Sequence, residues 1–70
     1  MKLVSYRAAF YLFQNKAGYL EVVTYKNDGH FYYKQFKDLS KEHTANLKRT
    51  TKSDILNLIN TGEYELTYVD

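Results

Sequence analysis

The fold is decided by residues 3–37, which run LVSYRAAFYLFQNKAGYLEVVTYKNDGHFYYKQFK. Apolar and polar side chains alternate through much of this segment, and a period of two is typical of a β-strand. Residues 15–18 (NKAG) and 27–29 (NDG) interrupt the alternation with residue types that favour tight turns. The segment therefore predicts a three-stranded antiparallel meander, with strands near residues 3–13, 19–26 and 30–37.

The first turn sets which residues of the first two strands face each other. A type I turn with a bulge at Gly18 pairs Asn15 with Tyr19. On that register Leu12 faces Val22 and points toward the core, while the odd-numbered side chains point to the other face of the sheet. The odd-numbered pairs are Tyr11 with Val23 and Ala9 with Tyr25.

The second turn allows two registers, which differ by one residue and exchange the two faces of the third strand. A two-residue Asp28-Gly29 loop turns residues 31, 33 and 35 toward the core, whereas a bulged three-residue loop turns residues 30, 32, 34 and 36 inward. We prefer the two-residue loop, because it buries Phe31 and Tyr33 and leaves Lys34 in water.

The second half of the chain predicts one helix and a final strand. Residues 38–49 are polar and predict a loop with at most a turn of helix, for which Ser40 is a candidate N-cap. Thr51 or Ser53 caps the main helix, which ends at residues 61–62 (TG), and alternation resumes in residues 63–69. The apolar stripe of the helix consists of Ile55, Leu56, Leu58 and Ile59, and the inward residues of the last strand are Tyr64, Leu66 and Tyr68.

The predicted fold is a single α+β domain, residues 1–70, in the order β-β-β-α-β. A small antiparallel sheet, made of the meander and the C-terminal strand, carries one helix on one face. The last strand lies either beside the first strand or at the opposite edge, and the sequence pattern leaves both arrangements open.

The amino-acid composition excludes several classes of protein and indicates where this domain acts. No cysteine is present, which excludes disulfides and thiolate metal sites. The longest wholly apolar run, residues 8–13, is far too short to span a bilayer, so we expect a cytoplasmic protein without a membrane association. Lysine greatly outnumbers arginine, and asparagine and tyrosine are abundant, which indicates an AT-rich genome such as that of a low-GC bacterium or its phage.

No constellation of residues predicts an enzyme. The two histidines, His30 and His43, lack the spacing of metal ligands. The serines and threonines lie in no nucleophile motif, and the three glycines are isolated turn residues rather than parts of a phosphate-binding loop. We therefore expect no catalytic residue, no metal and no cofactor.

Charge is distributed unevenly along the chain. Residues 1–37 carry a net charge of +4, residues 38–52 carry +2 and residues 53–70 carry −4. The acidic tail either pairs with the basic front inside the fold or leaves a basic patch free for an anionic partner. At the start of the helix, free N–H groups favour an anion. The basic residues there either bind a phosphate of nucleic acid or a carboxylate, or form a solvated loop that Asp54 compensates. The candidate residues of the basic patch are Lys26, Lys48, Arg49 and Lys52.

Eight tyrosines and four phenylalanines are too many rings for one small core. Because one short helix covers only one face of the sheet, we expect the other face to be a recognition surface. The sequence therefore predicts a small protein-binding module, such as a phage or mobile-element protein that inhibits a host factor. The alternatives are that the exposed face forms the interface of a homodimer, or that the protein is a nucleic-acid-binding domain. Strand addition at an exposed edge is a further route, which the sequence does not rank against the face. The predicted patch consists of Tyr11, Val23, Tyr25 and Tyr32, rimmed by Arg7 and Lys34.

Overall fold

The computed structural model describes residues 7–25 and 29–70, which form one antiparallel sheet, one α-helix and one 3-10 helix. The α+β class and the β-β-β-α-β order predicted from the sequence are confirmed, with a short strand and the 3-10 helix added between the meander and the α-helix. The elements are β1 (Arg7–Asn15), β2 (Gly18–Tyr25), β3 (Phe31–Phe36), η1 (Leu39–Thr44), β4 (Lys48–Thr50), α1 (Lys52–Gly62) and β5 (Glu65–Val69).

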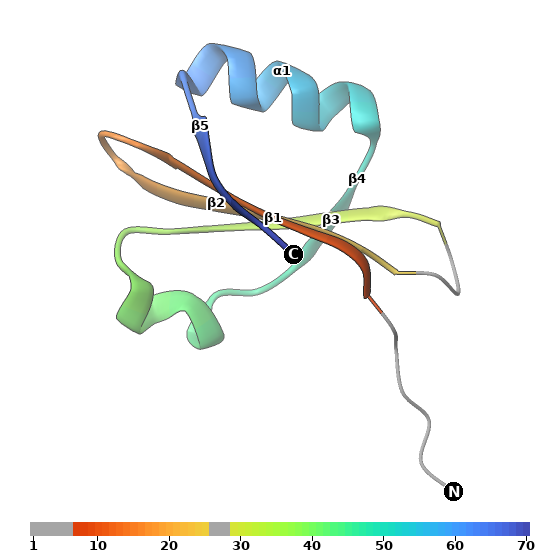
Figure 1. The fold of residues 1–70 in the computed structure, drawn as a ribbon, viewed down its shortest axis with the longest axis horizontal. Helices are drawn as coiled ribbons and strands as arrows, with labels where there is room; N and C mark the ends of the chain where they lie inside the picture. Colours follow the sequence, from red (N-terminus) through yellow and green to blue (C-terminus); the bar gives the residue numbers. More distant parts are fainter. Residues whose placement is uncertain (1–6, 26–28) are drawn as a thin grey trace, which may run out of the picture.

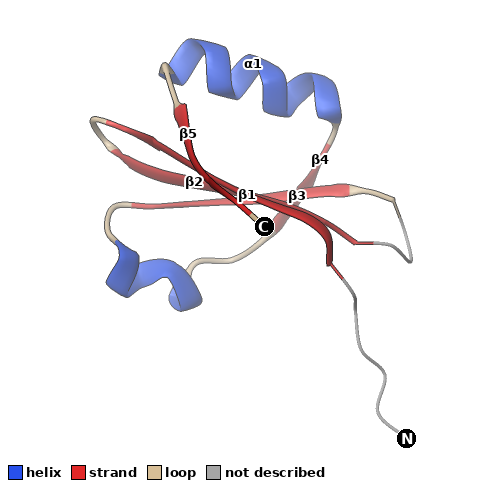
Figure 2. Ribbon diagram, in the orientation of Figure 1, coloured by secondary structure: helices blue, strands red, loops and turns tan. Residues whose placement is uncertain are grey.

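The sheet has the strand order β4-β3-β2-β1-β5, so the last strand lies beside the first (Figure 2). The helix α1 lies over one side of the sheet, and η1 lies on the opposite side (Figure 1). We call these two sides the helix face and the η1 face. The strands β4 and β5 are the two edges of the sheet in the described part of the chain.

The first hairpin is one residue tighter than predicted. Asn15 pairs with Gly18 rather than Tyr19, because the Asn15 Oδ1 accepts hydrogen bonds from the N–H groups of Ala17, at 2.8 Å, and Gly18, at 3.0 Å. A glycine is required at this point, since its φ is +152° and a Cβ there would lie 2.5 Å from the Phe36 carbonyl oxygen.

The tighter turn exchanges the two faces of β1. Tyr11 now faces Val22, and Leu12 faces Glu21. Tyr11 and Phe13 consequently pack with the core under the helix, so the prediction that even-numbered residues of β1 point inward was wrong.

The second hairpin has the predicted faces but not the predicted partners. Phe31 and Tyr33 pack against the core, as expected. Phe31 is opposite Thr24 and Tyr33 is opposite Val22, a displacement of two residues from the pairing that a two-residue loop gives. Displacement by an even number preserves the faces. The predicted Asp28-Gly29 loop lies partly outside the described residues, which resume at Gly29, whose N–H donates to the Tyr25 carbonyl at 3.0 Å.

The segment between β3 and α1 contains more structure than its polar composition predicts. The N-cap of η1 is Asp38, not Ser40: the Asp38 carboxylate accepts a hydrogen bond from the Ser40 N–H at 3.1 Å. The strand β4 follows and pairs with β3, with Lys48 opposite Tyr33. Its three residues carry no apolar alternation, so the sequence pattern did not predict this strand.

The helix α1 covers the hydrophobic core on one face of the sheet. Thr51 is the N-cap, and its Oγ1 accepts a hydrogen bond from the Asp54 N–H at 3.1 Å. The helix ends at Gly62, and Glu63 rather than a glycine adopts the left-handed conformation after it, with φ of 54°. No helix in the described part of the chain is long and apolar enough to cross a membrane.

Three of the four predicted stripe residues of the helix face the sheet. Ile55 is buried against Leu20 and Val22, and Leu58 and Ile59 pack around them. Leu56 is exposed, so its assignment to the apolar stripe was wrong.

A bulge in β5 breaks the alternation predicted for the last strand. Leu12 is opposite Tyr68 and Phe13 is opposite Leu66, which leaves Thr67 as an extra residue whose Oγ1 donates to the Leu12 carbonyl at 3.0 Å. The extra residue places Leu66 on the helix face and Tyr68 on the η1 face, where its ring centroid lies 6.1 Å from that of Phe10. The prediction that Tyr68 points inward with Leu66 was therefore wrong.

Candidate binding edge

The structure separates the residues of the predicted aromatic patch. Val23, Tyr25 and Tyr32 share the η1 face, and the rings of the two tyrosines meet edge to face with centroids 5.4 Å apart. Val23 is buried, and both tyrosines are half-buried. Tyr11 lies on the helix face and cannot belong to this group. Arg7 is opposite Tyr25 in the register of β1 and β2.

Lys34 is not the exposed rim residue that the sequence predicted. Its side chain is only 12% exposed, because η1 covers this part of the sheet. The Nζ donates to the Glu42 carbonyl of η1 at 2.7 Å and lies 3.9 Å from the carboxylate of Glu21. The centre of the η1 face is therefore occupied by the protein itself.

Exposed apolar side chains gather instead on the edge strand β5. Leu66, Tyr68 and Val69 are 51%, 54% and 53% exposed. They belong to both faces, since Leu66 and Val69 lie on the helix face and Tyr68 on the η1 face. An apolar strand at the edge of a sheet is a template for pairing with a further strand.

The backbone polar groups of β5 at Val69 point to the outer side of the edge. The Asp70 N–H donates to the Phe10 carbonyl at 2.9 Å, so Asp70 points its polar groups toward β1. In an antiparallel ladder the direction alternates from residue to residue, so the N–H and C=O of Val69 point away from β1. A donor and an acceptor are thus presented on the outer side of the edge.

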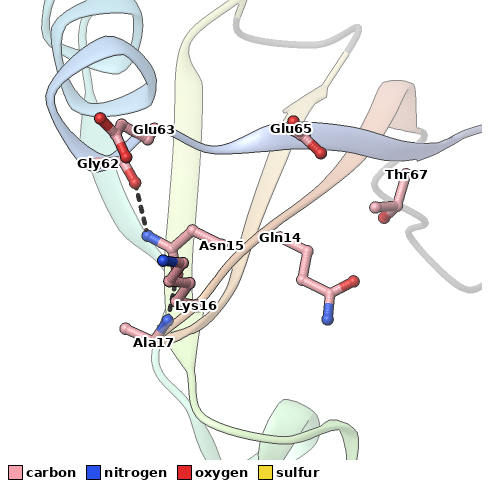
Figure 3. Close-up of a pocket in the computed structure, with 8 residues that line it drawn as sticks. All are labelled: Gln14, Asn15, Lys16, Ala17, Gly62, Glu63, Glu65 and Thr67. Atoms are coloured by element: carbon pink, nitrogen blue, oxygen red, sulfur yellow. Dashed lines mark hydrogen bonds between the residues drawn. The ribbon is translucent and has the colours of Figure 1, made fainter.

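A cavity of about 710 Å³ adjoins the start of β5, between the first turn and the end of α1 (Figure 3). The Asn15 Nδ2 donates to the Gly62 carbonyl at 2.8 Å and so joins the turn to the helix end. The cavity is open to solvent, and its lining combines polar and apolar surface. Its lining residues are Gln14, Asn15, Lys16, Ala17, Gly62, Glu63, Glu65 and Thr67.

The predicted anion-binding residues do not form one surface. Lys48 is opposite Tyr33 and Arg49 is opposite Tyr32, so the two side chains emerge on opposite faces of β4. Both are exposed, as is Lys52 in the first turn of α1. Lys26 lies outside the described residues.

Metal coordination receives no support from the described residues, among which no group of three or more His, Cys, Asp or Glu side chains is placed to hold an ion.

Comparison of the chain with models of protein families found no match. Searches of curated proteins and of solved structures found no significant match either.

The candidate site at β5 was not predicted from the sequence. Its alternation was read as one buried and one exposed face, and the Thr67 bulge could not be seen in that pattern. The available signal was the combination of Leu66, Tyr68 and Val69 in a terminal strand without lysine or proline, which are residues that commonly protect an edge.

Proposed function

We propose that this protein is a non-enzymatic protein-binding module that takes an extended segment of another protein onto the outer edge of β5. The observation that carries the proposal is the exposure of Leu66, Tyr68 and Val69 on a strand that ends the sheet. The η1 face supports binding less well, because Lys34 and η1 cover its centre.

Strand addition divides the work between backbone and side chains. Backbone hydrogen bonds from Val69 contribute affinity that does not depend on the partner's sequence, and the side chains on the two faces contribute specificity. Leu66 and Val69 contact alternate residues of the partner on the helix face, and Tyr68 contacts those on the η1 face. A small phage or mobile-element protein would inhibit a host factor by pairing with one of its extended segments in this way.

Selection from a random peptide library displayed on phage tests this proposal. We expect enriched peptides whose binding is lost in Val69→Pro, because proline has no N–H to donate and its ring blocks the outer edge. The matched control is Val69→Thr, which keeps the N–H and the β-branched shape, and it should retain binding. If no peptide is enriched, or if the enriched peptides bind Val69→Pro as well as the wild type, binding at the β5 edge is excluded.

Nucleic-acid binding is the second candidate, supported by the exposed Lys48, Arg49 and Lys52 near the β4 edge. Arg49 lies opposite Tyr32, which places a cation beside a ring on the η1 face. A titration with mixed-sequence DNA and RNA at two salt concentrations tests it, since affinity should fall steeply with salt and should weaken in Arg49→Gln. No measurable affinity at low salt would exclude this candidate.

A further inference from the structure

The side chains that pack beneath α1 become larger from the middle of the sheet toward its sides. The middle strand, β2, contributes Leu20 and Val22, which are buried against Ile55 of the helix. The strands on either side of it, β1 and β3, contribute rings to the same core. Because a strand displaced from the helix needs a longer side chain to fill the space up to it, close packing explains this gradient. The rings are those of Tyr11, Phe13, Phe31 and Tyr33.

The edge strand β5 does not continue this gradient. It lies one strand further out than β1, and its apolar side chains on the helix face are Leu66 and Val69. Both are smaller than a ring, and they remain 51% and 53% exposed. The described part of the chain therefore leaves the outer strip of the helix face apolar and largely uncovered.

A third exposed apolar side chain, Leu56 of α1, lies on the same side of the molecule. Asp54 and Thr61 line a cavity together with Tyr33 of β3, so this flank of the helix is turned toward β3 and β4. Successive residues of a helix are about 100° apart, which places Leu56 on the opposite flank, toward β1 and β5. Its side chain is 51% exposed. We call Leu56, Leu66 and Val69 the apolar patch.

We infer that the occupant of the β5 edge is an extended segment of another protein with aromatic residues at alternate positions, and that Leu56 selects for these rings. This inference rests on the proposed function and adds the chemical class of the partner. A segment that pairs with β5 places every second side chain on the helix face, next to the apolar patch. Rings at those positions reach from the edge toward α1, as the rings of β1 and β3 do, whereas short side chains leave Leu56 in water. Aromatic residues also bury a large area each and are enriched at the centres of protein interfaces.

A second copy of the chain fits the apolar patch less well. An antiparallel copy of β5, related by a two-fold axis, joins its helix face to that of the first copy. It therefore brings Leu66 and Val69, the same short side chains that leave the patch exposed. A copy with its faces reversed brings a single ring, that of Tyr68. Neither copy provides aromatic residues at alternate positions.

Two synthetic peptides of equal length and charge test the inference, Lys-Thr-Tyr-Thr-Tyr-Thr-Glu and Lys-Thr-Val-Thr-Val-Thr-Glu. Isothermal titration calorimetry with the full chain should give about tenfold tighter binding for the tyrosine peptide. Leu56→Ala should bind the two peptides about equally, because the contact between α1 and the rings is lost. The matched control is Leu39→Ala, which shortens a leucine that is 54% exposed on η1, on the opposite side of the sheet (Figure 1), and it should keep the wild-type preference. Val69→Pro should bind neither peptide.

The outcomes separate the inference from the proposed function. Equal binding of both peptides by the wild type overturns the inference, and so does a preference for the tyrosine peptide that persists in Leu56→Ala. If Val69→Pro abolishes that binding, the β5 edge remains the binding surface. A dimer in light scattering that Val69→Pro dissociates identifies a second copy as the occupant and also overturns the inference.

Peptides enriched from the random library give the same decision if neither synthetic peptide binds. Alternate aromatic residues in these peptides, with affinity at least about tenfold weaker for Leu56→Ala, support the inference. Library peptides that require the β5 edge but lack such residues, or that bind Leu56→Ala with unchanged affinity, overturn it. Binding of no peptide at this edge, synthetic or from the library, overturns the proposed function as well.

Discussion

Lys34 and Glu21 lie directly opposite each other on β3 and β2, with the Lys34 Nζ 3.9 Å from the Glu21 Oε2. Both side chains are largely buried, and Lys34 also donates to the Glu42 carbonyl at 2.7 Å. This pair therefore connects the centre of the sheet to η1. The face that the single α-helix leaves uncovered is covered at its centre by η1, and for this reason we place the proposed recognition surface at an edge of the sheet.

Breaking this pair from one side should destabilise the fold. Lys34→Met removes the ammonium and leaves the Glu21 carboxylate buried without it, at a cost on the order of 3 kcal/mol. The double variant Glu21→Leu/Lys34→Met should recover most of the loss, because apolar residues replace a buried ion pair with little penalty. Urea denaturation of the two single variants and the double variant measures the coupling. Additive losses would show that the two side chains do not interact.

Shortening a side chain of α1 that packs on the sheet should strongly destabilise the fold. Ile55→Ala should lower the free energy of unfolding by about 2–5 kcal/mol, because it opens a cavity against Leu20 and Val22. Leu56→Ala, on the same helix, is the matched control and should change stability by about 0.5 kcal/mol or less, since Leu56 is exposed. Thermal unfolding followed by circular dichroism compares them, and similar losses for both would contradict the orientation of α1.

The sequence allowed either Thr51 or Ser53 as the N-cap of α1, and the structure shows that Thr51 is the cap. Thr51→Ala should cost about 1 kcal/mol, because the Asp54 N–H loses its acceptor. Ser53→Ala should be close to neutral, since Ser53 is an exposed residue inside the first turn. Chemical denaturation of both variants compares their free energies of unfolding. A larger loss of stability in Ser53→Ala would show that the helix starts at a different residue.

The link between the first turn and the end of α1 can be tested at Asn15. Asn15→Asp keeps the oxygen that closes the turn but loses the N–H that donates to the Gly62 carbonyl. We expect a loss of about 1–3 kcal/mol, because a carboxylate then faces a carbonyl oxygen. Asn15→Ala should lose the turn bonds as well. Amide exchange in the last turn of α1 should accelerate in both variants, and unchanged exchange there would show that the link is unimportant.

Much of the fold could be predicted because its signals are local. Alternation identified β1, β2, β3 and β5, and the capping residues and apolar stripe identified α1. The faces of β3 followed from the preference for burying Phe31 and Tyr33. These features depend on residues close together in the chain.

The errors arose where a single side chain or a distant contact decides the structure. The Asn15 side chain tightened the first turn by one residue and exchanged the faces of β1, so Tyr11 left the predicted patch. The burial of Lys34 depends on η1, whose position over the sheet is not encoded by hydrophobic periodicity. The bulge at Thr67 moved Tyr68 to the other face, so the apolar side chains of the β5 edge lie on both faces of the sheet.

The most direct test of binding at the β5 edge is amide hydrogen exchange at Val69, measured by NMR with and without a peptide selected from the random library. The Val69 N–H points away from β1, so binding should slow its exchange by at least about tenfold. The Asp70 N–H, which already donates to Phe10, should change much less. Protection that appears at Tyr25 and Tyr32, with Val69 unchanged at saturating peptide, would contradict strand addition and return the binding surface to the η1 face.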